Sequence, residues 1–174
     1  MEKEWILPLV AQLIGVCGMA SLFAMYQQTD RRKLVRYKLI TDVLWVFHYC
    51  CLGAWAGAIP NFVGIFRELV FVNKEKKWAR CFLWPILFIL ANWALAALSW
   101  KSALSLLPIG ASTFVTLALW ADRPKVTRLI CLPVSVCFMI YDVFVGSWVG
   151  IINESIGIFS IVTALLKKDR KQED

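Results

Sequence analysis

The chain has 174 residues, of which 60% are hydrophobic, and its formal net charge is +7 at pH 7. Nine Trp and eleven Phe over so few charges exclude a soluble domain of this length and place the chain among membrane proteins. The basic residues form short clusters between apolar runs and leave no soluble domain, so nucleic acid is not expected as a partner.

Seven apolar runs are each long enough to cross the hydrocarbon core of a membrane as a helix. In chain order they cover residues 5–26, 39–54, 55–73, 81–99, 103–121, 128–145 and 148–166. Very short connections join the second run to the third and the sixth run to the seventh. The sequence therefore predicts an all-α membrane protein with seven transmembrane helices, a single membrane domain over residues 1–174 and a cytoplasmic tail over residues 167–174.

The positions of Lys and Arg predict the orientation of these helices. Basic residues follow the first, third, fifth and seventh runs, as Arg31, Arg32, Lys33, Arg36 and Lys38, then Lys74, Lys76, Lys77 and Arg80, then Arg123, Lys125 and Arg128, and finally Lys167, Lys168, Arg170 and Lys171. Because Lys and Arg remain on the cytoplasmic side, we expect the N-terminus outside and the C-terminus in the cytoplasm.

Two stretches of the chain resemble each other, GAWAGAIPNFVGIFRELVF at 53–71 and GSWVGIINESIGIFSIVTA at 146–164. After a shift of 93 positions, identical residues coincide at Gly53, Trp55, Gly57, Ile59, Gly64, Ile65 and Phe66. Asn61 coincides with Glu154. Each unit holds three runs, so the run between them leaves the two units parallel. The sequence predicts a 3+1+3 arrangement, with triple-helix repeats over 5–73 and 103–166 and a linker helix over 81–99.

The 3+1+3 pattern resembles the PQ-loop and SWEET superfamily of transporters, and nearly the whole chain is similar to the bacterial inner-membrane family labelled YgjV. The likeness is carried by LLPIGAS at 106–112, the Gly-x-Trp-x-Gly bends, Arg67 and Glu154. The resemblance implies a location in the bacterial inner (plasma) membrane and a substrate site near mid-membrane between the repeats. The chain departs from the superfamily at Pro8 and Pro108, which are followed by Leu and Ile rather than by Gln.

Asn61 and Glu154 each stand on a helix face of small residues, with a glycine one turn before and one turn after. One interpretation is a packing seam, because small residues let helices approach closely and a polar side chain then bonds the neighbouring helix. The other is a solute pathway, because an intramembrane carboxyl is costly and usually marks one. We expect Asn61, Glu154 and the adjacent Asn153 to bind substrate.

Trp45 and Tyr49 on the second run and Asp142 on the sixth complete the predicted substrate site. An aromatic face beside hydrogen-bonding groups suits a flat or sugar-like solute. Ordinary packing, or a position in the aromatic belt at the membrane surface, is the alternative for Trp45 and Tyr49.

Proton coupling or gating is expected from Glu154, His48, Asp42 and Arg67. For His48 the alternative is a hydrogen-bonded packing residue, since burial lowers the pKa of an imidazole. For Asp42 the alternative is solvation or pairing with a basic neighbour. For Arg67 the alternative is snorkelling toward the inner surface, or pairing with Glu68 or with an acid on the second run.

We predict a small-solute transporter that works by alternating access between two triple-helix bundles. Its solute would be polar or cationic, sugar- or nucleoside-like, with proton coupling as one option. The alternative is a non-transporting membrane receptor or scaffold. We expect no enzyme activity, cofactor or metal, because no CxxC pair, His cluster or nucleophile–base pair is present. The expected partners are the solute and the lipid bilayer, and the oligomeric state is left open.

Overall fold

The computed structural model describes residues 6–51, 55–98, 106–121, 123–145 and 148–173, and this part of the chain forms seven helices and no strand. Their bounds are α1 Ile6–Gln27, α2 Arg31–Cys51, α3 Trp55–Phe71, α4 Leu83–Leu98, α5 Leu106–Trp120, α6 Pro124–Val145 and α7 Trp148–Glu173. Three of the helices contain segments that are long and apolar enough to cross a membrane, at Leu9–Gln27, Pro124–Tyr141 and Val149–Lys167. Helices α4 and α5 are shorter and also apolar.

Several helices extend beyond the expected spans at their basic ends. Helix α2 begins at Arg31, so the basic cluster that precedes the expected span at 39–54 forms its first two turns. Asp30 explains this start, because its Oδ1 accepts a hydrogen bond of 2.8 Å from the backbone N–H of Lys33 and so caps the helix. Helix α6 begins at Pro124, a residue whose fixed φ suits a first helical position.

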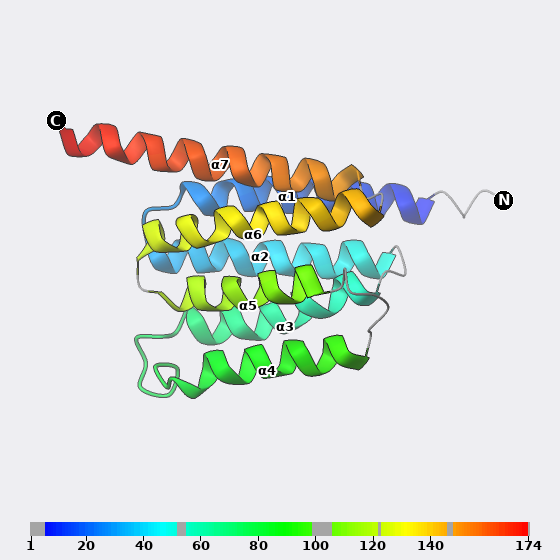
Figure 1. Cartoon of the computed structure of the whole chain (residues 1–174), viewed down its shortest axis with the longest axis horizontal. Coiled ribbons are helices and arrows are strands. Elements are labelled where there is room, and N and C mark those ends of the chain that lie inside the picture. Colours follow the sequence, from blue (N-terminus) through cyan, green and yellow to red (C-terminus); the bar gives the residue numbers. More distant parts are fainter. Residues whose placement is uncertain (1–5, 52–54, 99–105, 122, 146–147, 174) are drawn as a thin grey trace.

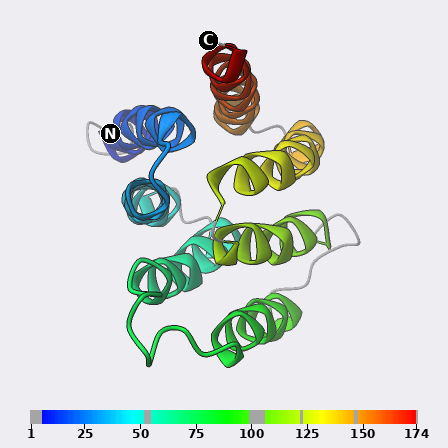
Figure 2. The ribbon, with the colours of Figure 1, turned by 90° about the vertical axis from the view of Figure 1, so that its left-hand side faces the viewer.

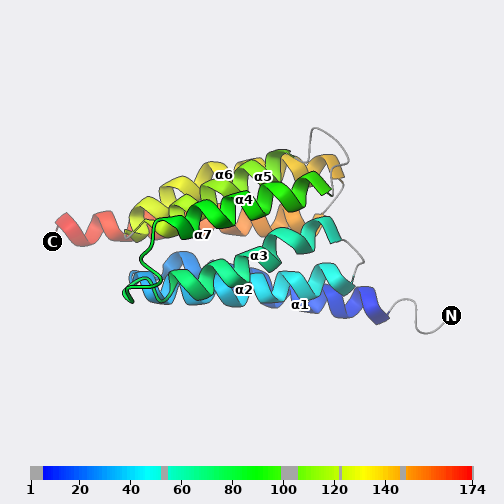
Figure 3. The same cartoon turned by 90° about the horizontal axis from the view of Figure 1, so that it is seen from below.

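The helices lie side by side and alternate in direction (Figure 1). Each helix from α1 to α7 contacts the next one along the chain, and further contacts join α1 to α7 and α3 to α5. These contacts close a ring of six helices, α1–α2–α3–α5–α6–α7, and leave α4 outside it against α3 and α5 (Figure 2). Figure 3 shows α1, α2 and α3 in one layer, with α4, α5 and α6 in the layer opposite.

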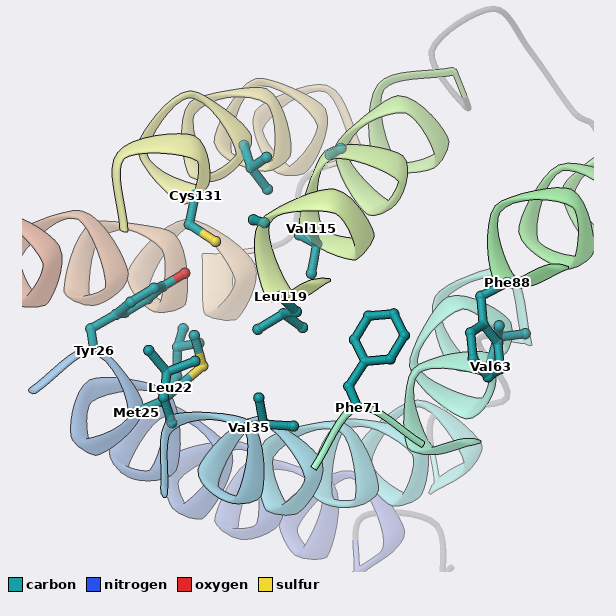
Figure 4. Packing of buried hydrophobic residues seen from close by; sticks show 14 of the residues in the cluster. Leu22, Met25, Tyr26, Val35, Val63, Phe71, Phe88, Val115, Leu119 and Cys131 are labelled. Carbon is teal, nitrogen blue, oxygen red and sulfur yellow. The ribbon is translucent and has the colours of Figure 1, made fainter. Parts of the chain in front are cut away.

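Apolar side chains close the interior of the ring at its basic end, the end where α1, α3 and α5 finish and α2, α4 and α6 begin. Fully buried members of this cluster include Met25, Leu34, Val35, Phe71, Leu119, Cys131 and Ile161. In Figure 4, Leu22, Val35, Leu119 and Phe71 converge from four different helices. The outer surface carries large apolar side chains that suit lipid contact, among them Leu13, Phe47, Phe82, Leu90, Phe114 and Phe159.

Arg31 ties three helices together at the basic end. Its guanidinium donates hydrogen bonds of 3.1 Å to the carbonyl of Phe71, 3.1 Å to that of Leu119 and 3.3 Å to that of Ala121. Carbonyls at the end of a helix have no partner within the helix and carry partial negative charge, so a cation stabilises them. Arg31, from the first half of the chain, thus holds the C-terminal ends of α3 and α5 together.

Two more cations cap helix ends at the same place. Arg128 donates to the carbonyl of Tyr26 at 2.7 Å and to the carbonyl of Gln28, which joins α6 to the end of α1. Lys74 donates to the carbonyl of Trp120 and lies 4.2 Å from the centre of its indole ring. Basic residues that would only mark the cytoplasmic side in a sequence therefore also fasten the two halves of the chain to each other.

A polar seam joins α1 to α7 nearby. Gln27 donates to the carbonyl of Ser160 at 2.9 Å, to its hydroxyl at 3.0 Å and to the hydroxyl of Thr163 at 3.2 Å. The Ser160 hydroxyl donates to the carbonyl of Phe23 at 2.8 Å. These bonds close the ring between its first and last helices.

Candidate functional site, a cavity inside the six-helix ring

The six helices of the ring enclose a cavity of about 150 Å³. On the side toward the basic end it is lined by Leu22 and Tyr26 of α1, Lys38 of α2, Arg67 of α3 and Val115 of α5. The rest of its lining comes from the middle and second halves of α2 and α6 and from the first halves of α3, α5 and α7. Because successive helices alternate in direction, these segments lie toward the end opposite the basic end. Most of the cavity lining therefore lies away from the basic end, beyond the apolar and cationic closure.

Aromatic rings form one part of the lining. Trp45 and Tyr49 come from α2, with ring centres 5.4 Å apart, and Phe138 and Tyr141 come from α6. Trp45 can pack closely because it faces Gly18 of α1, where an added Cβ would lie 3.3 Å from its indole nitrogen. The cavity therefore offers apolar ring faces from two different helices.

Polar side chains of α3 and α7 form another part. Asn61 and Glu154 both line the cavity, as does Asn153, whose side chain is 7% exposed. The Asn153 amide nitrogen donates to Glu154 Oε1 at 3.0 Å, which leaves the amide oxygen as the atom that accepts. That oxygen is buried and accepts no hydrogen bond from the described part of the chain.

A buried cluster of four charges forms the floor of the cavity. Asp42 is 1% exposed, pairs with Lys38 one turn earlier on α2 and lies 3.6 Å from the Arg67 guanidinium. Arg67, 2% exposed, donates two hydrogen bonds of 2.9 and 3.0 Å to Glu68, which is fully buried. Two cations and two carboxylates balance formally, which is the condition under which charges are tolerated away from water.

Arg67 also connects the floor to the second half of the chain. It donates to the Thr116 hydroxyl at 2.9 Å, and Thr116 donates to the carbonyl of Ser112 at 2.9 Å. The Ser112 hydroxyl, which lines the cavity, accepts from Asn92 at 3.0 Å. A continuous set of polar contacts thus runs from α2 through α3 and α5 to α4.

Gly64 makes room for this charge cluster. A Cβ added there would overlap the Asp42 carboxylate and lie 3.2 Å from the Arg67 guanidinium. We expect Gly64→Ala to lower the free energy of unfolding by about 1–3 kcal/mol, the cost of overpacking a tight site. The measurement is thermal unfolding of the purified protein in detergent, followed by circular dichroism.

Gly110→Ala is the matched control for Gly64→Ala. Gly110 also lies within a helix, but an added Cβ would meet nothing within 4 Å in the described part of the chain. We expect this variant to melt at or slightly above the temperature of the unaltered protein, because alanine favours a helix more than glycine does. Equal melting temperatures for the two variants would contradict the close contact between Gly64 and Asp42.

The structure brings seven of the nine sequence-predicted site residues to this cavity, namely Asp42, Trp45, Tyr49, Asn61, Arg67, Asn153 and Glu154. His48 is not among the lining residues. It is 3% exposed, its Nδ1 lies 2.7 Å from the carbonyl of Ala11, and its ring packs edge-on against Trp45. A nitrogen facing a carbonyl must donate, so His48 binds α1 to α2 in this state. The side chain of Asp142 lies outside the part of the chain that the structure describes.

Sequence reasoning missed the contributions of α1 and α5 to the lining. Tyr26 lies within hydrogen-bonding reach of Cys131 and Ser135 on α6, and its hydroxyl points toward Cys131 in Figure 4. Pro108 and Ser112 line the cavity from α5. The one available signal was the serine in LLPIGAS, a polar residue within an apolar run.

The chain matches the family model Imp-YgjV, described as a bacterial inner membrane protein, over residues 9–172. Searches of curated proteins and of solved structures found no match. The protein therefore belongs to the Imp-YgjV family and is a bacterial inner membrane protein.

Proposed function

We propose that the protein transports a small polar solute across the inner membrane by alternating access between two triple-helix bundles, α1–α3 and α5–α7. The observation that carries this proposal is the cavity, which both bundles line with polar and aromatic side chains and which α4 does not reach. Substrate sites of transporters built from parallel repeats lie at the interface between the repeats. All seven helices run side by side, which supports a crossing of the membrane by the other helices beside α1, α6 and α7.

Equivalent contacts in the two bundles support the repeat. Gly64 faces Asp42 on the preceding helix, and 93 positions later Gly157 faces Ser135, with an added Cβ 3.5 Å from the Ser135 hydroxyl. Both members of each equivalent pair Asp42–Ser135, Trp45–Phe138 and Asn61–Glu154 line the cavity. This agreement favours the 3+1+3 arrangement and a place beside the PQ-loop and SWEET superfamily.

The cavity's position suggests which side of the membrane it serves. With the basic end in the cytoplasm and the N-terminus outside, the cationic caps, the α1–α7 seam and the apolar cluster close the cytoplasmic side. The structure then corresponds to a state that faces outward. Opening to the cytoplasm would require the two bundles to separate at Arg31, Arg128 and Gln27.

Arg67 and Asp42 suit a gating role in this cycle. Arg67 contacts the second bundle through Thr116 and the first through Asp42 and Glu68, so it lies where the two bundles meet below the cavity. Glu154 is the group that we propose to carry coupling, because it is a carboxyl in the lining and above the paired charges of the floor.

Uptake into proteoliposomes tests the function. Vesicles containing the purified protein would be offered radiolabelled glycerol, alanine, ribose and cadaverine, which are neutral, zwitterionic or cationic. We expect at least one solute to enter faster than into protein-free vesicles. Binding of a solute without any uptake would overturn the proposal that the protein is a carrier, and would favour a receptor or scaffold.

A further inference from the structure

The size of the cavity restricts what it holds. A volume of about 150 Å³ corresponds to roughly five water molecules, and an apolar protein cavity of that size holds a benzene molecule. The fitting solute thus has roughly six to eight non-hydrogen atoms. A hexose or a nucleoside is larger than this space, so a smaller solute than the sugar- or nucleoside-like one expected from the sequence fits it better.

The charges around the cavity favour a cation. Lys38 and Arg67 are the described cations of the lining. Lys38 pairs with Asp42, and Arg67 donates to Glu68 and Thr116. Asp42 and Glu154 are the described carboxylates of the lining, and Glu68 stands directly behind Arg67. Counted as ionised, the three carboxylates exceed the two cations by one charge.

A buried oxygen at the cavity accepts no hydrogen bond from the described residues. It is Asn153 Oδ1, and the Asn153 side chain lines the cavity. Asp42 Oδ2 also accepts no hydrogen bond from them, but it faces Gly64 and lies 3.6 Å from the Arg67 guanidinium. Leaving a buried acceptor unsatisfied costs free energy, so a bound molecule that donates is favoured over one that only accepts. The Glu154 carboxylate fixes the orientation of the Asn153 amide, so this acceptor cannot become a donor by a flip of the amide.

On these grounds, and resting on the proposed function, we infer that the solute is a small alkylammonium cation. An N–H group of this cation bonds Asn153 Oδ1 while Glu154 supplies the compensating charge. Its alkyl part lies against Trp45 and the other ring faces, which attract both apolar groups and cations.

Three probes with equal numbers of non-hydrogen atoms test this inference. Cadaverine carries two charges and N–H donors, pentanediol carries O–H donors without charge, and choline carries one charge and an O–H group but no N–H donor. The melting temperature of the purified protein in nanodiscs would be measured against the concentration of each compound. We expect cadaverine to raise it at the lowest concentration, choline to be weaker and pentanediol to be without effect.

Variants locate the binding site. We expect Asn153→Leu to weaken the apparent affinity for cadaverine by about ten-fold, the effect of losing one hydrogen bond to a charged group. Ser155→Ala is the control, because Ser155 is exposed and its hydroxyl donates only to Ile151 of its own helix among the described contacts. If Asn153→Leu does not fold, Glu154→Gln must instead weaken cadaverine binding while retaining the side chain's size.

The outcomes separate this inference from the proposed function. If pentanediol binds as tightly as cadaverine, the inference that the solute is a cation is overturned. If choline binds as tightly as cadaverine, the inference that an N–H group donates to Asn153 is overturned. Uptake of a neutral solute with no cadaverine binding would overturn the inference and leave the transporter. Cadaverine binding without uptake of any solute would retain the site and overturn transport.

Discussion

Replacing Arg67 by methionine is expected to lower the free energy of unfolding by about 3–5 kcal/mol, the usual cost of breaking a buried ion pair by removing one partner. Methionine fills much of the volume of arginine, so the lost stability comes from the removed charge rather than from a cavity in the packing. Glu68 loses both of its described hydrogen bonds, and Asp42 retains only Lys38. Unfolding of the detergent-solubilised protein in increasing dodecyl sulfate provides the measurement.

Arg32→Met is the matched control for Arg67→Met. Arg32 also forms an ion pair, with Glu75, but the two side chains are 44% and 77% exposed. An exposed pair contributes about 0–1 kcal/mol, so this variant should unfold almost like the unaltered protein. Adding Asp42→Asn and Glu68→Gln to Arg67→Met should restore part of the lost stability. If Arg67→Met alone unfolds like Arg32→Met, the four charges do not form the neutral cluster described above.

Replacing Glu154 by glutamine is expected to reduce solute uptake by a factor of about 30 or more, since loss of one partner of a buried charge pair costs about 2 kcal/mol or more in binding. Glutamine has nearly the same shape and still accepts from Asn153, so the fold should persist. Initial uptake rates in proteoliposomes, at solute concentrations well below saturation, provide the measurement.

Two controls accompany Glu154→Gln. Ser155→Ala alters the neighbouring, exposed residue and should leave uptake unchanged. The melting temperature of Glu154→Gln without solute should equal that of the unaltered protein, which separates a lost solute contact from a lost fold. Unchanged uptake by a folded Glu154→Gln would remove Glu154 from both solute binding and coupling, and would favour a scaffold in which this carboxyl only bonds a neighbouring helix.

Glu154→Gln and Arg67→Met probe different levels of the same cavity. Glu154 lies in its lining near the start of α7, whereas Arg67 lies in its floor near the end of α3. We therefore expect the first variant to alter transport more than stability and the second to alter stability first. Gly64→Ala acts on the floor as well and should resemble a weaker Arg67→Met.

Local patterns in the sequence were sufficient for the class of protein and for the helices. Apolar runs of membrane length leave the backbone no partner but itself, so they form helices whatever surrounds them. The prediction of a bacterial inner membrane protein of the YgjV type is confirmed by the family match over 9–172. Helix periodicity also placed Asn61 and Glu154 on the glycine-bearing faces of their helices, and both face the cavity.

The rotation of each helix against its neighbours was decided only by tertiary packing. His48 and Trp45 stand close together on α2, yet one turns to the carbonyl of Ala11 and the other to the cavity, because Gly15 and Gly18 of α1 admit the two rings at those points. Periodicity assigns side chains to a face of one helix but carries no information about which partner that face meets.

The same limit applies to the charges. In the sequence Arg31 and Arg128 mark a side of the membrane, whereas in the fold they hold the carbonyl ends of α1, α3 and α5, which are distant along the chain. The sequence was compatible with several partners for Asp42 and for Arg67. In the fold the two side chains pair, because Gly64 lets α2 and α3 approach each other closely. The sequence by itself determined that polar groups had to lie inside the membrane domain, and close packing between helices decided which of them pair and which face the cavity.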